Sequence, residues 1–274
     1  MKLAFAVVTP DVSTPEVCAY RGPLGGIFAR LAELGYDGVE LMVRDPLEID
    51  LPELDKPLEQ FKLEVPCVTT GEIYACDRLT FMDPDESVRQ GAQDRMRDVI
   101  DFAQRVHSPN VNIGRFRGSF SADVSHEQSL EWAVSGFRRC ADYAADRDVW
   151  LVLEPINFLQ CDNINTTQEG LKFVARVDHP NFALMLDLFH MHVEDRSIIA
   201  SIAEAAKITR HVHVCDSNRQ APGRGALHFD VVLRTLSVVG YKGYLSGEML
   251  MIPDQDTAAA TTAEVIRPLL KNEE

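Results

Sequence analysis

The sequence lacks several features that mark common protein classes. Its six cysteines include no Cys-x-x-Cys pair, and it contains neither a G-x-G-x-x-G fingerprint nor a P-loop. No apolar run approaches the roughly 20 residues that a membrane-spanning helix needs. The apolar N-terminal stretch ends at Pro10 and Asp11, too early for a secretory leader. We therefore expect a cytoplasmic protein with reduced thiols and no membrane partner.

Basic residues are scarce. The chain has 27 Lys and Arg against 42 Asp and Glu, a formal net charge of −15. Such a surface repels a polyphosphate, so we expect no nucleic acid partner. The apolar share of 46% and charged share of 25% are ordinary for a globular protein with a sizeable core.

Eight short β-rich runs are present, and each is followed by an amphipathic helical pattern. The runs are Leu3–Thr9, Gly38–Val43, Val65–Thr70, Val111–Phe116, Trp150–Ile156, Phe182–Leu188, His211–Cys215 and Tyr244–Leu250. The helical stretches are Gly26–Leu34, Leu51–Phe61, Glu86–Val106, Glu127–Ala145, Thr167–Val177, Ser197–Ala206, Phe229–Val239 and Thr257–Leu270. This alternation predicts an α/β fold, a (β/α)8 TIM barrel, as a single domain over residues 1–274. The alternative, a doubly wound open sheet, would need the Gly-rich phosphate loop that is absent.

Polar residues interrupt four consecutive predicted strands near their C-terminal ends, where TIM barrels carry their working side chains. They are Glu154, Asp187, His213 and Glu248. Three carboxylates at the mouth of an apolar barrel are costly unless a cation neutralises them, so we predict that these four residues bind a metal. The mixed oxygen and nitrogen set favours Mn2+, Mg2+ or Co2+ over zinc. A single Glu after a strand more often caps a helix or joins an ion pair. Four ligand-type residues at equivalent depth in successive strands are hard to explain in that way.

Other polar residues lie close to these strand ends. His211 faces the same side as His213 one layer deeper, and we expect it to be a hydrogen-bonded core histidine. His190, with His192 as the alternative, is placed to contact a substrate oxygen. Arg219 is placed either to neutralise an oxyanion or to stabilise its turn by an ion pair. Glu72, Tyr74 and Arg115 lie on the predicted rim.

Several motifs resemble those of the xylose isomerase-like superfamily of TIM barrels. They are Glu154-Pro-x-Asn157, Asp187-x-Phe-His190-Met, His211-x-His213-x-x-Asp-Ser-Asn-Arg219 and Pro222-Gly-x-Gly225. Within it the chain looks most like the ketose 3-epimerases (the D-tagatose, D-psicose and L-ribulose type) and the 5-keto-L-gluconate epimerases. The resemblance implies a divalent metal on the four predicted ligands, Glu154 and Glu248 as acid and base, and His190 and Arg219 in contact with substrate. It also implies a homodimer or homotetramer.

One segment departs from the epimerase pattern. After Asn157 these epimerases usually have Arg, an aromatic residue and Glu, whereas this chain has Phe158, Leu159 and Gln160. A Gln at this place is more like the 2-keto-myo-inositol isomerases. We expect the Gln160 amide to contact a substrate hydroxyl and to affect the choice of sugar.

The predicted function is epimerisation of an unphosphorylated keto-sugar or keto-sugar acid through a cis-enediolate, with two glutamates exchanging protons. An aldose–ketose or 2-keto-myo-inositol type isomerase and a metal-dependent sugar-acid dehydratase remain alternatives, because they share the metal site. A repair nuclease would need extra histidines near the site, but His107 and His126 fall in helical stretches. A non-catalytic sugar-binding protein would not need two opposed carboxylates. The loop at 249–256 is apolar, then acidic, and lacks glycine, which disfavours a phosphorylated substrate.

Overall fold

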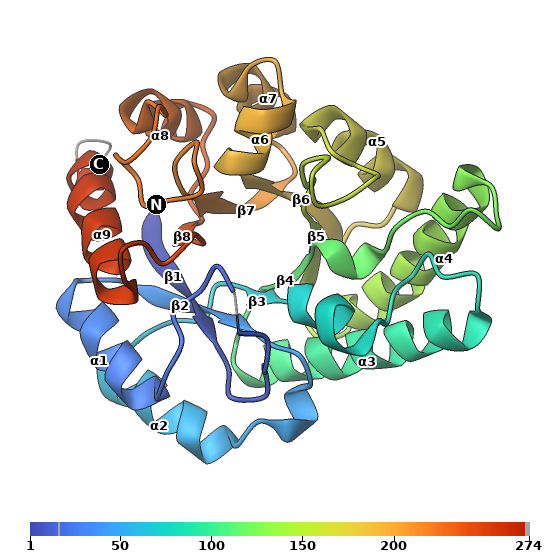
Figure 1. The fold of residues 1–274 in the computed structure, drawn as a ribbon, viewed down its shortest axis with the longest axis horizontal. Helices are drawn as coiled ribbons and strands as arrows, with labels where there is room; N and C mark the ends of the chain where they lie inside the picture. Colours follow the sequence, from blue (N-terminus) through green and yellow to red (C-terminus); the bar gives the residue numbers. More distant parts are fainter. Residues whose placement is uncertain (16, 272–274) are drawn as a thin grey trace.

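Eight parallel strands form a closed barrel in chain order, in a computed structural model that describes residues 1–15 and 17–271 (Figure 1). Each strand pairs with the next, and β8 pairs with β1. The strands are β1 (Lys2–Val8), β2 (Gly38–Met42), β3 (Val68–Thr69), β4 (Asn110–Ile113), β5 (Trp150–Leu153), β6 (Phe182–Asp187), β7 (Thr209–Val214) and β8 (Tyr244–Gly247). The predicted (β/α)8 TIM barrel is confirmed.

Helices surround the barrel (Figure 1). They are α1 (Leu24–Glu33), α2 (Leu51–Phe61), α3 (Glu86–Arg105), α4 (His126–Ala145), α5 (Thr167–Val177), α6 (Leu188–Glu194), α7 (Ile198–Ala205), α8 (Phe229–Val238) and α9 (Gln255–Lys271). Side-chain caps set several of their starts: the Ser125 hydroxyl accepts from the N–H of Gln128, and Thr166 forms a capping box with Glu169. None of the helices in the described part of the chain is long and apolar enough to cross a membrane.

Six of the eight strands are shorter than the sequence predicts. β2 and β6 are shorter by one residue each, and β5 and β8 end at Leu153 and Gly247, three residues before their predicted ends. β3 has two residues instead of the six expected, because Pro66 has no N–H to donate to a neighbouring strand. β4 ends at Ile113, and the chain then turns into a short 3-10 helix, η3 (Arg115–Arg117). Helix α6 was not predicted. It begins directly after β6, where the Asp187 carboxylate accepts the N–H groups of Phe189 and His190.

The barrel interior is filled by side chains that alternate along each strand. Val152, Ala183, Met185 and Cys67 form one buried cluster inside it. Because successive side chains on a strand point to opposite faces, residues two positions further along point to the same side. Glu154 and Asp187 therefore lie on the interior side, one layer closer to the C-terminal end of the barrel.

Candidate active site

Four side chains from neighbouring strands meet inside the barrel at its C-terminal end. Glu154 directly follows β5, Asp187 ends β6, His213 lies in β7, and Glu248 directly follows β8. One ligand-type atom from each lies within 4.8 Å of those from the other three. All four residues are buried, with at most 9% exposure. The structure thus brings together the four residues that the sequence predicts to converge.

The spacing of these atoms fits a small cation. His213 Nδ1 lies 3.8 Å from Glu154 Oε1, 3.6 Å from Asp187 Oδ2 and 3.5 Å from Glu248 Oε2, and it is buried with no hydrogen-bond partner among the described residues. Two atoms that each lie about 2.1 Å from one cation, at an angle of about 90–110°, are about 3.0–3.4 Å apart. An unpartnered nitrogen that faces three carboxylates near this spacing suits a divalent metal, and the donor set suits Mn2+, Mg2+ or Co2+.

Arg219 compensates two of the carboxylates. Its Nη1 donates to Asp187 Oδ2 at 2.6 Å, and its Nη2 donates to Glu248 Oε2. Burial alone would raise the pKa of both carboxyls, but the adjacent guanidinium outweighs it and both pKa values are lowered. Arg219 does form ion pairs, but with Asp187 and Glu248 and not within its own turn, and it lines the cavity.

The loop between β7 and α8 holds Arg219 in place. Arg219 itself has a positive φ of 61°, an uncommon conformation for a residue with a side chain. The Asp216 carboxylate stabilises the loop by accepting the backbone N–H groups of Ser217 (2.7 Å), Gly223 (2.8 Å) and Leu227 (3.0 Å). A Cβ on Gly225 would lie 2.3 Å from Asp216 Oδ1, so the close approach requires glycine there.

Of the two candidate histidines after β6, His190 is the one that faces the site. It is buried and lines the cavity, whereas His192 is exposed. The side-chain amide of Asn157 donates to His190 Nδ1 at 2.7 Å, which places the ring proton on Nε2. His190 Nε2 lies 3.7 Å from Glu154 Oε1. Burial lowers the pKa of His190 to about 4, so the ring is a neutral N–H donor toward the site.

Glu154 differs from the other two carboxylates because no guanidinium among the described residues contacts its carboxylate; Arg117 donates only to its backbone oxygen. Its Oε2 accepts from the Asn112 amide at 3.0 Å. Burial raises its pKa to about 7; the nearby His213 opposes the rise, and Glu248 adds to it. Without a metal ion, the negative charge of the carboxylates is therefore partly neutralised by bound protons. A metal ion that binds there would displace these protons.

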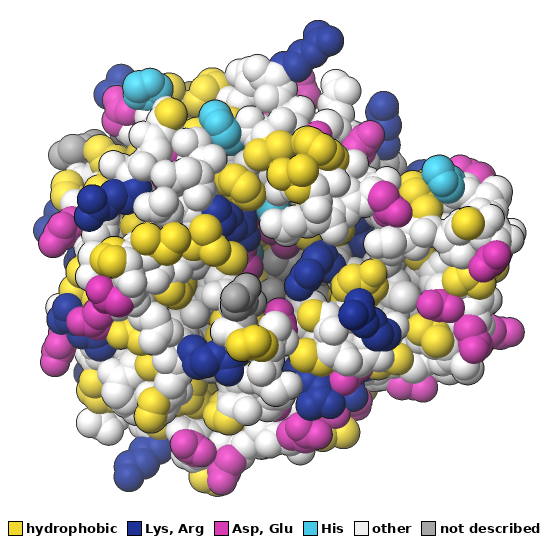
Figure 2. Space-filling model, in the orientation of Figure 1, with side chains coloured by type: hydrophobic (Ala, Val, Ile, Leu, Met, Phe, Trp, Pro, Cys, Tyr) yellow, Lys and Arg dark blue, Asp and Glu magenta, His cyan; other side chains and the backbone are white. Residues whose placement is uncertain are grey.

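A cavity of about 240 Å³ opens from the cluster to the C-terminal face. Figure 2 shows Lys or Arg side chains beside the hollow at the centre of this face, and Arg115 lines the cavity. Glu72 and the exposed Gln160 also line it, as the sequence predicts. Glu72 accepts from the hydroxyl of Thr14 and lies 3.9 Å from Arg115 Nη2.

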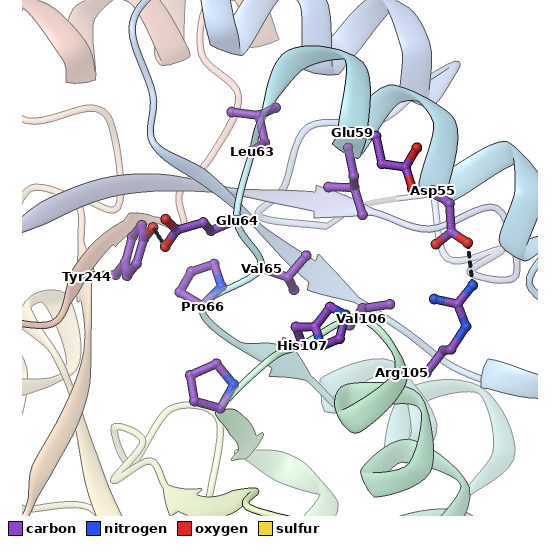
Figure 3. Close-up of a pocket in the computed structure, with 12 residues that line it drawn as sticks. Asp55, Glu59, Leu63, Glu64, Val65, Pro66, Arg105, Val106, His107 and Tyr244 are labelled. Atoms are coloured by element: carbon purple, nitrogen blue, oxygen red, sulfur yellow. Dashed lines mark hydrogen bonds and ion pairs between the residues drawn. The ribbon is translucent and has the colours of Figure 1, made fainter.

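A larger cavity of about 620 Å³ lies at the opposite end, where Pro66 and Pro109 precede β3 and β4 (Figure 3). Two of its acidic side chains have partners at the edge of the cavity. Asp55 forms an ion pair with Arg105, and Glu64 accepts from Tyr244 at 2.6 Å. Polar side chains do not converge there as they do around the four predicted metal ligands. We therefore assign the chemistry to the smaller cavity.

The two histidines of the first half lie away from the cluster, although His107 lies in the turn after α3 and only His126 lies in a helix. His107 lines the larger cavity at the opposite end, and the His126 ring stacks on Phe120 with centroids 3.9 Å apart. Neither supplies the additional metal ligands that a repair nuclease needs.

One buried carboxylate that contacts the predicted ligand His213 was not predicted. Glu40, buried in β2, accepts from Nε2 of both His211 and His213, each at 2.8 Å. The signal was a single Glu in the middle of an otherwise apolar strand, away from the C-terminal end where functional side chains are expected. His211 is a hydrogen-bonded core histidine, as predicted.

Comparison with known proteins identifies the family of the chain. The model of the xylose isomerase-like TIM barrel family matches residues 28–269. A D-psicose 3-epimerase of Agrobacterium fabrum is 34% identical over 228 residues, which are 82% of this chain and 78% of that protein. The hydroxypyruvate isomerase of Escherichia coli is 25% identical over 230 residues, 81% of this chain and 85% of that protein.

The fold agrees with solved structures as well. D-psicose 3-epimerase from Clostridium cellulolyticum, solved with D-tagatose, superimposes with a TM-score of 0.84 over the whole of both chains at 22% identity. Together with the family match, these similarities show that the chain belongs to the xylose isomerase-like TIM barrel family, in which its relatives include ketose 3-epimerases.

Proposed function

We propose that this protein is a divalent-metal-dependent epimerase of an unphosphorylated keto-sugar or keto-sugar acid. The observation that carries the proposal is the convergence of Glu154, Asp187, His213 and Glu248 around the unpartnered Nδ1 atom, at the base of a cavity open to solvent. Relatives named D-psicose and L-ribulose 3-epimerases support the substrate class.

Glu154 and Glu248 are the proposed acid and base. They follow β5 and β8, three strands apart around the barrel, so they approach a bound sugar from different directions. Inverting a carbon beside a ketone requires one carboxylate to take the proton from one face and the other to deliver a proton to the opposite face. A metal held by the four ligands would supply positive charge where the enediolate oxygens become negative.

Other cavity residues bind and orient the substrate in this proposal. His190 Nε2–H donates to a substrate oxygen, because its Nδ1 is occupied by Asn157. Arg219 stabilises negative charge on the substrate from beside Glu248. Gln160 and Glu72, on the loops after β5 and β3, contact substrate hydroxyls at the outer end of the cavity.

Aldose–ketose isomerisation is a second candidate. The similarity to a hydroxypyruvate isomerase favours it, and it proceeds through the same kind of intermediate, an enediolate. Epimerisation returns a proton to the carbon that lost it, on the opposite face, whereas isomerisation places the proton on the neighbouring carbon, so analysis of the product separates the two reactions. The same analysis identifies a dehydratase, whose product has lost water.

We further propose that one Mn2+, Mg2+ or Co2+ ion binds per chain, and that the protein is a cytoplasmic homodimer or homotetramer. The net charge of −15 supports a small substrate over a nucleic acid. Sedimentation of the purified protein tests the oligomeric state.

The function is tested by incubating the protein and Mn2+ with a panel of ketoses and keto-acids and separating the products by chromatography. We expect a metal-dependent change of configuration in at least one member of the panel. In parallel, metal analysis should give about one equivalent of metal per chain. The Asp187→Ala variant should lose this metal. The matched control Asp146→Ala, at an exposed position at the end of α4, should retain it. Full occupancy in Asp187→Ala would contradict the site.

A further inference from the structure

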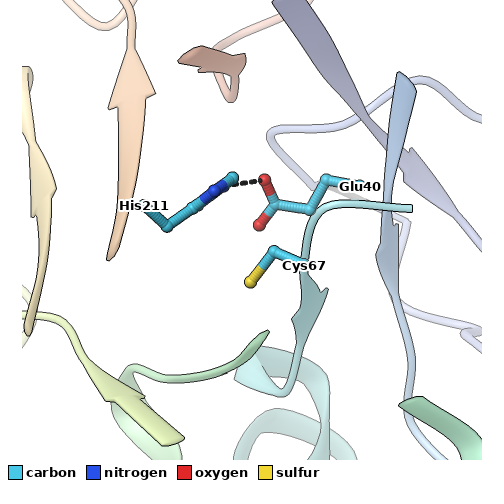
Figure 4. A group of neighbouring side chains, drawn as sticks. All are labelled: Glu40, Cys67 and His211. Carbon is cyan, nitrogen blue, oxygen red and sulfur yellow. Dashed lines mark hydrogen bonds and ion pairs between the residues drawn. The ribbon is translucent and has the colours of Figure 1, made fainter. Parts of the chain in front are cut away.

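A buried carboxylate lies directly beneath the proposed metal site. Glu40 has no exposed surface, and its two oxygens accept from two different rings: Oε1 from His213 Nε2 and Oε2 from His211 Nε2, each at 2.8 Å. The Glu40 side chain extends from β2 toward His211 across the barrel interior (Figure 4). The contact joins residues more than 170 positions apart in the chain.

This arrangement selects one tautomer of His213. A carboxylate can only accept, so both rings must present Nε2–H to Glu40. A neutral imidazole has one N–H and one lone pair, so the Nδ1 atom of His213 then carries the lone pair. That atom is the one that faces Glu154, Asp187 and Glu248, and within the described part of the chain it has no hydrogen-bond partner.

We propose that Glu40 is a positioning residue that holds His213 with its Nδ1 lone pair toward the metal site, and that His211 fixes Glu40 in turn. The inference rests on the metal site proposed above. Histidine ligands commonly donate their second ring N–H to a carboxylate, and the loss of that carboxylate typically weakens metal binding 10- to 100-fold.

A second metal ion on Glu40, Cys67 and His211 is the competing interpretation, since their ligand-type atoms lie within 4.8 Å of one another. Hydrogen bonding accounts for these side chains without one. Both Glu40 oxygens already accept from the histidines, and a metal on His211 Nε2 would displace the proton that Glu40 accepts. Burial raises the pKa of the Cys67 thiol well above its usual value, which opposes the thiolate form that binds metals.

Glu40→Gln tests the proposal because it replaces one acceptor oxygen by an NH2 group. If the new NH2 group faces His213, it donates to Nε2 of that ring, so the ring proton must lie on Nδ1. There the three carboxylates accept the proton, and Nδ1 can no longer bind a metal. If the NH2 group faces His211, the proton moves to a buried Nδ1 that has no partner. Without metal, the orientation in which the NH2 group faces His213 is favoured. Metal binding must turn the amide to the other orientation, which weakens the binding.

The measurement is the dissociation constant of Co2+, by chelator competition on the full chain. We expect a 10- to 100-fold increase in Glu40→Gln and no change in Glu204→Gln, a matched control exposed on α7. His211→Gln keeps an N–H donor for Glu40 and should change the constant less than about threefold, whereas His211→Leu leaves Glu40 Oε2 unpaired and should weaken binding more. If Glu40→Gln does not fold, the comparison of His211→Gln with His211→Leu still tests whether Glu40 positions His213.

Nitrogen-15 spectra of the imidazoles in the Mg2+-bound wild type provide an independent readout. We expect the His213 proton on Nε2; a proton on Nδ1 would overturn the inference. Equal Co2+ affinity in wild type and Glu40→Gln would overturn it while leaving the proposed function intact. Two equivalents of Co2+, one of them lost in Cys67→Ser, would overturn it in favour of a second metal site. A wild-type protein that binds no Co2+ would overturn both the metal site and this inference.

Discussion

Arg219 offers a quantitative test of how the cluster is balanced without metal. Its guanidinium is the cation that contacts both Asp187 and Glu248. Arg219→Met keeps the length of the side chain and removes the charge. Breaking a buried ion pair by removal of one partner typically costs about 3–5 kcal/mol.

The expected cost is at the lower end of that range. Once the guanidinium is gone, the pKa values of Asp187 and Glu248 rise, and one of the two carboxyls can take a proton. We therefore expect the metal-free variant to lose about 3 kcal/mol of unfolding free energy, or about 6–12 °C in Tm for a barrel of this size. A divalent ion supplies the missing positive charge, so saturating Mn2+ should narrow the difference from wild type.

The assay is thermal and urea unfolding of wild type, Arg219→Met and the control Arg234→Met, with EDTA or with Mn2+. Arg234 is exposed on α8, so its replacement should have little effect in either buffer. An Arg219→Met protein as stable as wild type in EDTA would refute the charge compensation. A difference that widens with Mn2+ would refute the idea that the metal and Arg219 neutralise the same carboxylates.

Three further predictions concern the loops and the acid–base pair. Asp216→Asn loses one acceptor oxygen for backbone N–H groups and should cost about 1–3 kcal/mol, measured by urea unfolding. Burial would raise the pKa of Asp216, but the backbone N–H donors outweigh burial and lower the pKa. The stabilisation of the fold by the Asp216 carboxylate is therefore fully present above the usual pKa near 3.8, and it is lost as the pH falls through the lowered pKa. Gln160→Glu should change the relative rates across a sugar panel and leave the metal dissociation constant unchanged; identical relative rates would show that Gln160 does not select the substrate. Replacing Glu154 or Glu248 by Gln should lower turnover by about two to four decades with at least partial metal retention, and near-normal turnover would exclude that residue as acid or base.

The sequence predicted the barrel and the convergence of Glu154, Asp187, His213 and Glu248 because both depend on local patterns. Apolar strands covered on both sides are recognisable as short apolar runs, and an inward-facing polar residue near the end of such a run stands out. The period of two then decides that these residues face the barrel interior, and their places near the strand ends put them at the C-terminal end of the barrel.

The remaining parts of the site depend on contacts between distant segments. Glu40 interrupts its strand in the same way as the predicted ligands, but its partners come from β7. Arg117 is fully buried and donates to the carbonyl oxygens of Glu154 and Gly114, which connects the loops after β4 and β5. No local pattern distinguishes it from a solvated loop arginine. Helix α6 was missed because it is short and follows β6 without a turn.

Solvent-hydrogen exchange tests the two-glutamate mechanism most directly. The protein with Mn2+ is incubated in heavy water with a ketose that it epimerises, and the product is analysed by NMR and mass spectrometry. Because a proton held by Glu154 or Glu248 exchanges with solvent before it is delivered, we predict deuterium at the inverted carbon of the product. Unlabelled product after many turnovers would contradict this mechanism and favour internal transfer of the substrate hydrogen.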